Sequence, residues 1–112
     1  MMTDSMDAVF RALGHPARRR ILDIVKDRPG SSVQEVCEHF DTSRIAVMKH
    51  LRILAEADLL HSEKKGRTRR LYHNTVPIQM IYDRWTSEYS ALWAKRMTEI
   101  KYRVESREKR DG

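Results

Sequence analysis

The sequence predicts a mainly α-helical fold with one small β-hairpin, and three observations support this. A short capped helix is expected to begin after Ser32, and a tight turn over residues 41–43 leads into an amphipathic helix over residues 44–57. Two short strands follow, over residues 60–64 and 69–74, around a turn that contains Gly66. About five helices and a two-stranded wing in this order are the layout of a winged helix-turn-helix.

The helices before this segment follow the same rules. Residues 4–13 carry apolar side chains at helical spacing, with Asp4 or Ser5 as the cap, and Gly14 ends that helix. Pro16 suits the first turn of the next helix, which extends to about residue 26. Within the helix over residues 44–57, Ser43 is the expected N-cap. The expected buried stripe consists of Val47, Leu51 and Leu54.

The last helix is expected to be long, from Pro77 to about residue 108. Its apolar positions recur at steps of three, four and seven, which resembles a heptad seam. At 1.5 Å per residue it would span on the order of 45 Å, whereas a domain of this size has a radius of gyration of about 13 Å. We therefore expect a second copy of the chain to cover it, with residues 1–13 and 77–108 as the dimerisation helices. The expected interface residues are Met6, Val9, Phe10, Ile81, Trp85, Tyr89, Leu92, Trp93, Met97 and Ile100.

Length, charge and cysteine content limit the class of protein. The 112 residues suit a single domain over residues 1–112, with the helix-turn-helix at 32–57 and the wing at 60–74. The net charge is +6, and residues 43–74 carry eight basic and three acidic side chains, which gives +5 in under a third of the chain. This skew favours a polyanionic partner. Cys37 is the one cysteine, no apolar run approaches a membrane span, and the N-terminus lacks a secretory pattern, so a cytoplasmic protein that does not engage membranes is expected.

The exposed face of the helix over residues 44–57 and the wing are the candidate contacts to double-stranded DNA. Arg44 and Lys49 can donate to guanine or phosphate, Ile45 and Met48 can contact a thymine methyl, and the helix N-terminus suits a phosphate. The turn at Arg67 can enter a minor groove. The predicted DNA-binding residues are Thr42, Ser43, Arg44, Ile45, Met48, Lys49, Arg52, Lys64, Lys65, Arg67, Thr68 and Arg69.

Other clusters favour structural roles. Arg18, Arg19 and Arg20 form a second basic group, from which one or two side chains can bind phosphate and at least one is expected to pair with an acid such as Asp23 or Asp7. No two histidines have the i, i+4 spacing of a helical metal pair, and Cys37 falls on a buried helix side. No catalytic pattern or phosphate-binding glycine loop is present. The sequence therefore predicts no enzyme, metal site or cofactor.

Three motifs resemble the ArsR-type (arsenic-repressor-like) winged-helix transcriptional regulators. They are RALGHPARRRIL from Arg11, SRIAVMKHLRIL from Ser43, and EADLLHSEKKGRTRRLYHN from Glu56. The segment from Pro77 to Met97 is similar to a metal-independent branch of that family. The resemblance implies a homodimeric DNA-binding repressor that dimerises through its first and last helices. Metal-sensing members carry a cysteine pair before the turn, where this chain has Ser32 and Gln34, so the resemblance does not imply a metal inducer.

Two alternatives stay open beside a homodimeric regulator of an inverted-repeat operator. The winged helix can be a protein–protein interaction module, or it can be a small-ligand-responsive sensor of the same fold. The operator, the regulated genes, the direction of regulation, and any small-molecule or protein effector are not readable from the sequence.

Overall fold

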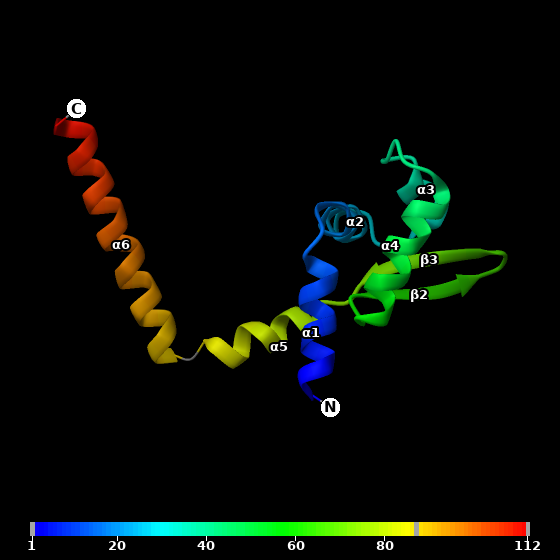
Figure 1. Ribbon diagram of the computed structural model, residues 1–112, viewed down its shortest axis with the longest axis horizontal. Coiled ribbons are helices and arrows are strands. Elements are labelled where there is room, and N and C mark those ends of the chain that lie inside the picture. Colours follow the sequence, from blue (N-terminus) through cyan, green and yellow to red (C-terminus); the bar gives the residue numbers. More distant parts are fainter. Residues whose placement is uncertain (1, 87, 112) are drawn as a thin grey trace. The chain divides into compact units, whose positions relative to one another are not determined.

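The computed structural model describes the backbone of residues 2–86 and 88–111 and the side chains of residues 5–86 and 92–106. The chain forms two compact units, Met1–Gln79 and Met80–Gly112, and each unit is described by itself. The elements of the first unit are α1 (Met2–Leu13), α2 (Pro16–Asp27), β1 (Ser31–Ser32), α3 (Val33–Cys37), α4 (Arg44–Glu56), β2 (Leu60–Lys65), β3 (Thr68–His73) and the start of α5 (Val76–Trp85) (Figure 1). The second unit contains the rest of α5 and α6 (Glu88–Asp111).

The predicted mainly α-helical fold with a small hairpin is confirmed, but the sheet has one strand more than expected. It is antiparallel, in the order β1-β3-β2. β1 pairs Ser31 with Leu71, and Gly30 N donates to Leu71 O at 2.8 Å. Two residues are too few to show an alternating pattern, so this strand was not predictable from its own residues. The hairpin turn is tighter than predicted, since Lys65 pairs with Thr68 and Gly66 has a φ of +64°, which favours glycine.

The core of the first unit lies between α1, α2, α4 and the sheet. The predicted stripe of α4 is confirmed, because Val47, Leu51 and Leu54 are all buried. The other buried apolar residues are Val9, Ala12, Ile21, Leu22, Val25, Val36, Ala57, Leu59, Leu60 and Leu71. Val9, a predicted dimer-interface residue, instead belongs to the core, because it is only 5% exposed within a single copy. Its spacing on α1 could not distinguish the chain's own core from a partner's surface.

Side-chain and backbone caps fix both ends of α4. Ser43 Oγ accepts from Ala46 N at 3.2 Å, so the predicted N-cap is confirmed. At the other end Asp58 has a φ of +62°, and its N donates to Ala55 O while Leu59 N donates to Leu54 O, both at 3.0 Å. This pair of bonds is a Schellman motif, with the buried Leu54 and Leu59 as its apolar contact. The motif sets the direction in which the chain leaves α4 for β2.

Arg18 joins three helices rather than pairing with an acid. Its Nε donates to Ala12 O at 2.7 Å and its Nη2 to Arg11 O at 3.0 Å, while Nη1 lies 3.2 Å from His50 Nδ1 on α4. The last carbonyls of α1 have no helical partner of their own, so a guanidinium from α2 satisfies them. Arg18 is therefore not the member of the basic group that pairs with Asp23 or Asp7. Figure 1 shows that only a short connection separates α1 from α2.

The predicted last helix is two helices, not one. α5 ends at Trp85 and α6 begins at Glu88. Thr86 Oγ1 donates to Tyr82 O at 2.5 Å, and such local bonding by a short hydroxyl side chain competes with helix continuation. The heptad spacing continues through this point, so periodicity alone did not reveal the break. Among the described residues, no helix has the combination of length and hydropathy that crossing a bilayer needs.

Two half-buried histidines link the stability of the first unit to pH. Burial lowers the pKa of His50, and the positive charges of His15, Arg18 and Lys49 lower it further. Burial also lowers the pKa of His73, with Lys26 acting in the same direction and Asp23 opposing it. His73 Nε2 is buried and has no hydrogen-bond partner among the described residues. The unfolded chain therefore binds more protons than the folded chain just below the usual histidine pKa of about 6.5.

We expect the free energy of unfolding to be constant above about pH 7 and to fall as the pH drops through the window below about 6.5, because both folded-state pKa values are lowered. Chemical denaturation at several pH values measures this slope. His50→Asn is the matched variant, since an amide oxygen can accept from Arg18 in place of Nδ1 and does not titrate. It should show a shallower loss on acidification than the wild type. An unchanged slope would assign the titration to other groups.

Candidate nucleic-acid interface

The side of α4 opposite its buried stripe is the centre of the candidate site. Every predicted DNA-binding side chain on this helix is exposed, including Ile45 at 83% and Met48 at 42%. An isoleucine so exposed on a well-packed helix is costly in water, at about 25 cal/mol per Å² of apolar surface. The helix therefore presents an apolar contact flanked by Arg44 and Lys49, and side chains of these kinds are able to contact base edges.

The N-terminus of α4 is suited to a phosphate. Thr42 and Ser43 are exposed just before the helix, and its first turn contains no acidic residue. Free amides at a helix N-terminus carry partial positive charge and attract anions. This end of the helix can therefore hold the backbone of a nucleic acid beside the exposed side chains of α4.

A hydrogen bond between the two helices of the helix-turn-helix positions Arg44. Its Nη1 donates to Gln34 Oε1 on α3 at 3.0 Å, and both side chains are exposed. A long arginine side chain otherwise has many rotamers, so this bond restricts where the guanidinium can point. No sequence pattern assigned Gln34 to the site. The two residues are ten positions apart, and only the turn geometry brings them together.

The basic residues of the wing lie on two faces of the hairpin. Cross-strand partners share a face, so Lys64 and Arg69 lie on one face of the hairpin. Lys65 and Thr68 lie on the opposite face. Arg69 Nη1 donates to Ser62 Oγ at 3.3 Å. The five predicted wing residues, Lys64, Lys65, Arg67, Thr68 and Arg69, are all exposed. The wing can therefore present cations to phosphates on either side of its turn.

Arg70 differs from its neighbours on the wing. It is partly buried, donates to Gly30 O at 3.2 Å and lies 3.6 Å from Glu35 Oε1. Its charge is used to join the sheet to α3 rather than to meet a ligand. Arg19 and Arg20 also have partners within the chain: Arg19 donates to Leu13 O at 2.6 Å, and the Arg20 guanidinium stacks 5.2 Å from the centre of the Phe40 ring.

The residues predicted at the dimer interface fall into three groups. Val9 belongs to the core, and Met6 and Ile81 are half-buried. The side chain of Tyr89 lies outside the described residues. The exposed members are Phe10, Trp85, Leu92, Trp93, Met97 and Ile100. On α6 alone, Met97 is 60% exposed and Ile100 52%, so this helix carries a large apolar surface within a single copy.

Metal-ligating side chains do not gather in the described part of the chain. Within it, no group of three or more His, Cys, Asp or Glu residues is placed to hold a metal ion. Cys37 is half-buried at the end of α3, less enclosed than the core position that its spacing suggested. The ring centres of His15 and His50 lie 4.7 Å apart, beside the Arg18 guanidinium. The positive charge of Arg18 disfavours a metal cation at these two rings.

Comparison with known proteins agrees with this geometry. Residues 13–63 match a family model described as a helix-turn-helix domain. The HTH-type transcriptional regulator YuzN of Bacillus subtilis is 34% identical over 90 residues, which cover 75% of this chain and 98% of that protein. The transcriptional repressor SdpR of Bacillus subtilis is also 34% identical, over 74 residues that cover 66% of this chain and 81% of SdpR.

Solved structures give the same assignment. An ArsR-like transcriptional regulator from Rhodococcus sp. RHA1 superposes with a TM-score of 0.70 at 28% identity, covering 94% of each chain. The relatives, the matched helix-turn-helix and the winged fold described above agree with one another. This chain belongs to the ArsR-type winged helix-turn-helix transcriptional regulators.

Proposed function

We propose that two copies of this chain bind one DNA duplex as a homodimer and repress transcription from an inverted-repeat operator. The observation that carries the proposal is the division of α4 into a buried stripe and an exposed face with Arg44, Ile45, Met48 and Lys49. A helix divided in this way can enter a major groove while its domain stays folded. Repression is supported by the relative SdpR, which is named a transcriptional repressor.

In this proposal each part of the surface has its own task. Lys64, Lys65, Arg67 and Arg69 contact phosphates and supply most of the affinity, since charge neutralisation dominates binding to DNA. The exposed face of α4 supplies most of the discrimination between sequences. Two copies related by a two-fold axis would place their α4 helices in successive major grooves, about 34 Å apart.

Dimerisation through α6 is supported by its apolar surface. Trp93, Met97, Ile100 and Val104 follow one another at steps of four, three and four residues, so they share one side of the helix. All four are at least partly exposed in a single copy. Covering such a stripe with the same stripe of a second copy removes it from water, and a two-fold interface is self-complementary.

Salt dependence is the first test of DNA binding. If the dimer neutralises about eight phosphates, the logarithm of the binding constant should fall with the logarithm of salt concentration with a slope of about −7. Arg67→Met should make the slope shallower by about two for a dimer, because it removes one cation per copy. Lys95→Met, on α6, is the control for charge alone. Fluorescence anisotropy with a selected duplex measures both values, and a slope near zero for the wild type would contradict the proposal.

Gln34→Ala tests how Arg44 is positioned. Losing one hydrogen bond of about 0.5–1.5 kcal/mol in each copy should weaken binding to each half-site by roughly two- to tenfold, and it should relax the preference at the base pair that Arg44 contacts. The salt slope should not change, since glutamine carries no charge. In the double variant with Arg44→Ala, Gln34→Ala should cause no further loss. Fully additive effects of the two substitutions would show that Gln34 acts independently of Arg44.

Charge substitution on α6 tests the dimer. Met97→Glu with Ile100→Glu should give a monomer, because two carboxylates would have to be buried without partners. Lys95→Glu makes the same change of two units in net charge on the other side of the helix and should remain a dimer. Sedimentation equilibrium distinguishes the 13.3 kDa chain from a pair of chains. A wild-type monomer, or a double variant that stays dimeric, would place the interface elsewhere or remove it.

A further inference from the structure

A concavity of about 280 Å³ lies between α4, the N-terminus of α3 and the inner face of the hairpin. We call it the α4–wing concavity, and its lining residues are Val33, Met48, Leu51, Arg52, Ala55, Leu60, His61, Ser62, Arg69 and Leu71. It lies entirely within the first unit. Its volume is near the lower limit of small-molecule sites, which is about 300 Å³, so it suits a compact ligand.

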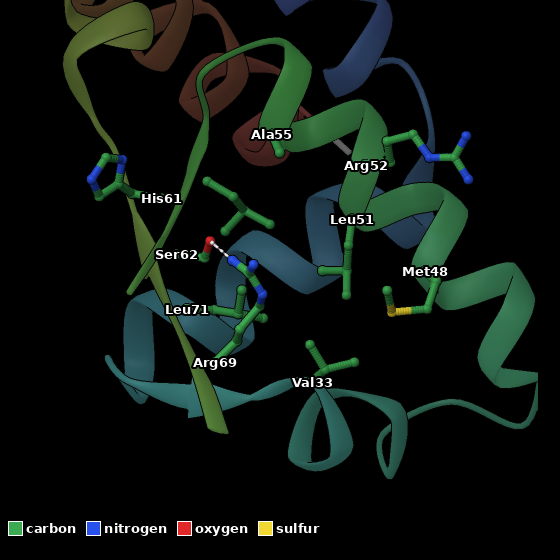
Figure 2. A pocket seen from close by; sticks show the side chains of 10 residues that line it. Val33, Met48, Leu51, Arg52, Ala55, His61, Ser62, Arg69 and Leu71 are labelled. Atoms are coloured by element: carbon green, nitrogen blue, oxygen red, sulfur yellow. Dashed lines mark hydrogen bonds between the residues drawn. The ribbon is translucent and has the colours of Figure 1, made fainter. Parts of the chain in front are cut away.

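The inside of the concavity is apolar. Figure 2 shows Val33, Met48, Leu51 and Leu71 directed toward one shared space, from α3, α4 and β3. Leu51 and Leu71 are otherwise almost fully buried, so this space is a shallow opening into the core of the unit. An apolar group that enters it would contact methyl and thioether groups on three sides, and burying it removes apolar surface from water.

The open side of the concavity carries positive charge. Arg69 is exposed, and its guanidinium lies beside Ser62, where it donates one hydrogen bond to Ser62 Oγ at 3.3 Å (Figure 2). A guanidinium has five N–H groups, so most of its donors are available beyond this bond. Lys64, the cross-strand partner of Arg69, adds a second cation on the same face. None of the lining residues is acidic, and Glu63 lies on the other face of β2.

From this arrangement we infer that the α4–wing concavity binds a small organic carboxylate with an apolar body. The apolar body would occupy the space between Met48, Leu51 and Leu71, and the carboxylate would accept from the Arg69 guanidinium at the open side. Charge complementarity selects this occupant, because an arginine and a carboxylate match in both charge and fork geometry. A neutral apolar molecule would leave the guanidinium without a counterion.

Such a ligand would compete directly with DNA, and this step rests on the proposed function. Met48 and Arg69 belong both to the concavity and to the proposed DNA surface. The same guanidinium cannot hold a carboxylate and a phosphate in one geometry. Ligand binding would therefore lower the affinity for DNA by a factor of one plus the ratio of ligand concentration to its dissociation constant, for each copy bound.

Octanoate, titrated into the full chain without DNA, tests the site. Methyl NMR should show saturable shifts at Val33, Leu51 and Leu71. Octan-1-ol has the same chain without the charge, and it should bind at least about tenfold more weakly. Equal binding of the alcohol, shifts confined to Leu92 and Val104 on α6, or no saturation would each overturn the inference.

Three substitutions distinguish the concavity from general charge attraction. Arg69→Met should weaken octanoate binding about tenfold, whereas Arg67→Met removes the same charge at the hairpin turn and should bind octanoate as the wild type does. Ala55→Leu should also weaken binding, because the larger side chain fills part of the space. All three positions are exposed, so the variants are expected to fold. Equal losses in Arg69→Met and Arg67→Met would mean that net charge alone attracts the anion.

The competition is measured separately, by titrating a duplex at constant ionic strength with and without octanoate. The apparent dissociation constant for the duplex should rise with octanoate in the wild type, and the same proportional rise in Arg69→Met should need about ten times more octanoate. If octanoate binds the concavity and the duplex affinity does not respond, direct competition is overturned. If the chain binds no duplex at all, the proposed function fails, and the titration without DNA still decides whether the concavity is a site.

Discussion

The burial of Val47, Leu51 and Leu54 is the constraint on which the rest of the first unit depends. These three side chains fix the rotation of α4 about its own axis, and so they decide that Arg44 and Lys49 face outward. They also fix where α4 ends. The Schellman motif that follows buries Leu59 and directs the chain into β2, so the position of the wing is set by the C-terminus of α4. Helix face and wing are therefore placed together by one packing arrangement.

The positive charge of the chain is divided between structural and surface roles. Arg18 donates hydrogen bonds to backbone carbonyls at the end of α1. Arg70 donates to a backbone carbonyl just before β1 and also lies beside Glu35. Arg67 and Arg69 are exposed on the same hairpin. Net charge and motif composition treat these arginines alike. Burial and hydrogen bonding separate them, which is why the count of basic residues overstates the charge available to DNA.

The sequence was most informative where a pattern is local. The caps at Ser32 and Ser43 and the stripe of α4 follow from short-range spacing, and the structure has them as predicted. Features that depend on distant partners were not predictable in the same way. The two-residue strand β1 exists because Ser31 pairs with Leu71, a residue 40 positions further along the chain. The roles of Arg18, Gln34 and Val9 likewise depend on how helices meet, and helical spacing describes only one helix at a time.

A ligand site shared with the DNA surface would make regulation possible without a conformational change. Allosteric control needs a second global state whose population the ligand shifts. Direct competition needs only that one group serve both partners, and Arg69 is placed to do so because it lines the α4–wing concavity and donates to Ser62 Oγ within the exposed wing. In a two-fold dimer each half-site carries its own concavity, so two ligands would act on one operator. The affinity for DNA would then fall by the square of the factor that one bound ligand causes. A ligand with a weak affinity for each concavity could therefore still release the dimer from DNA.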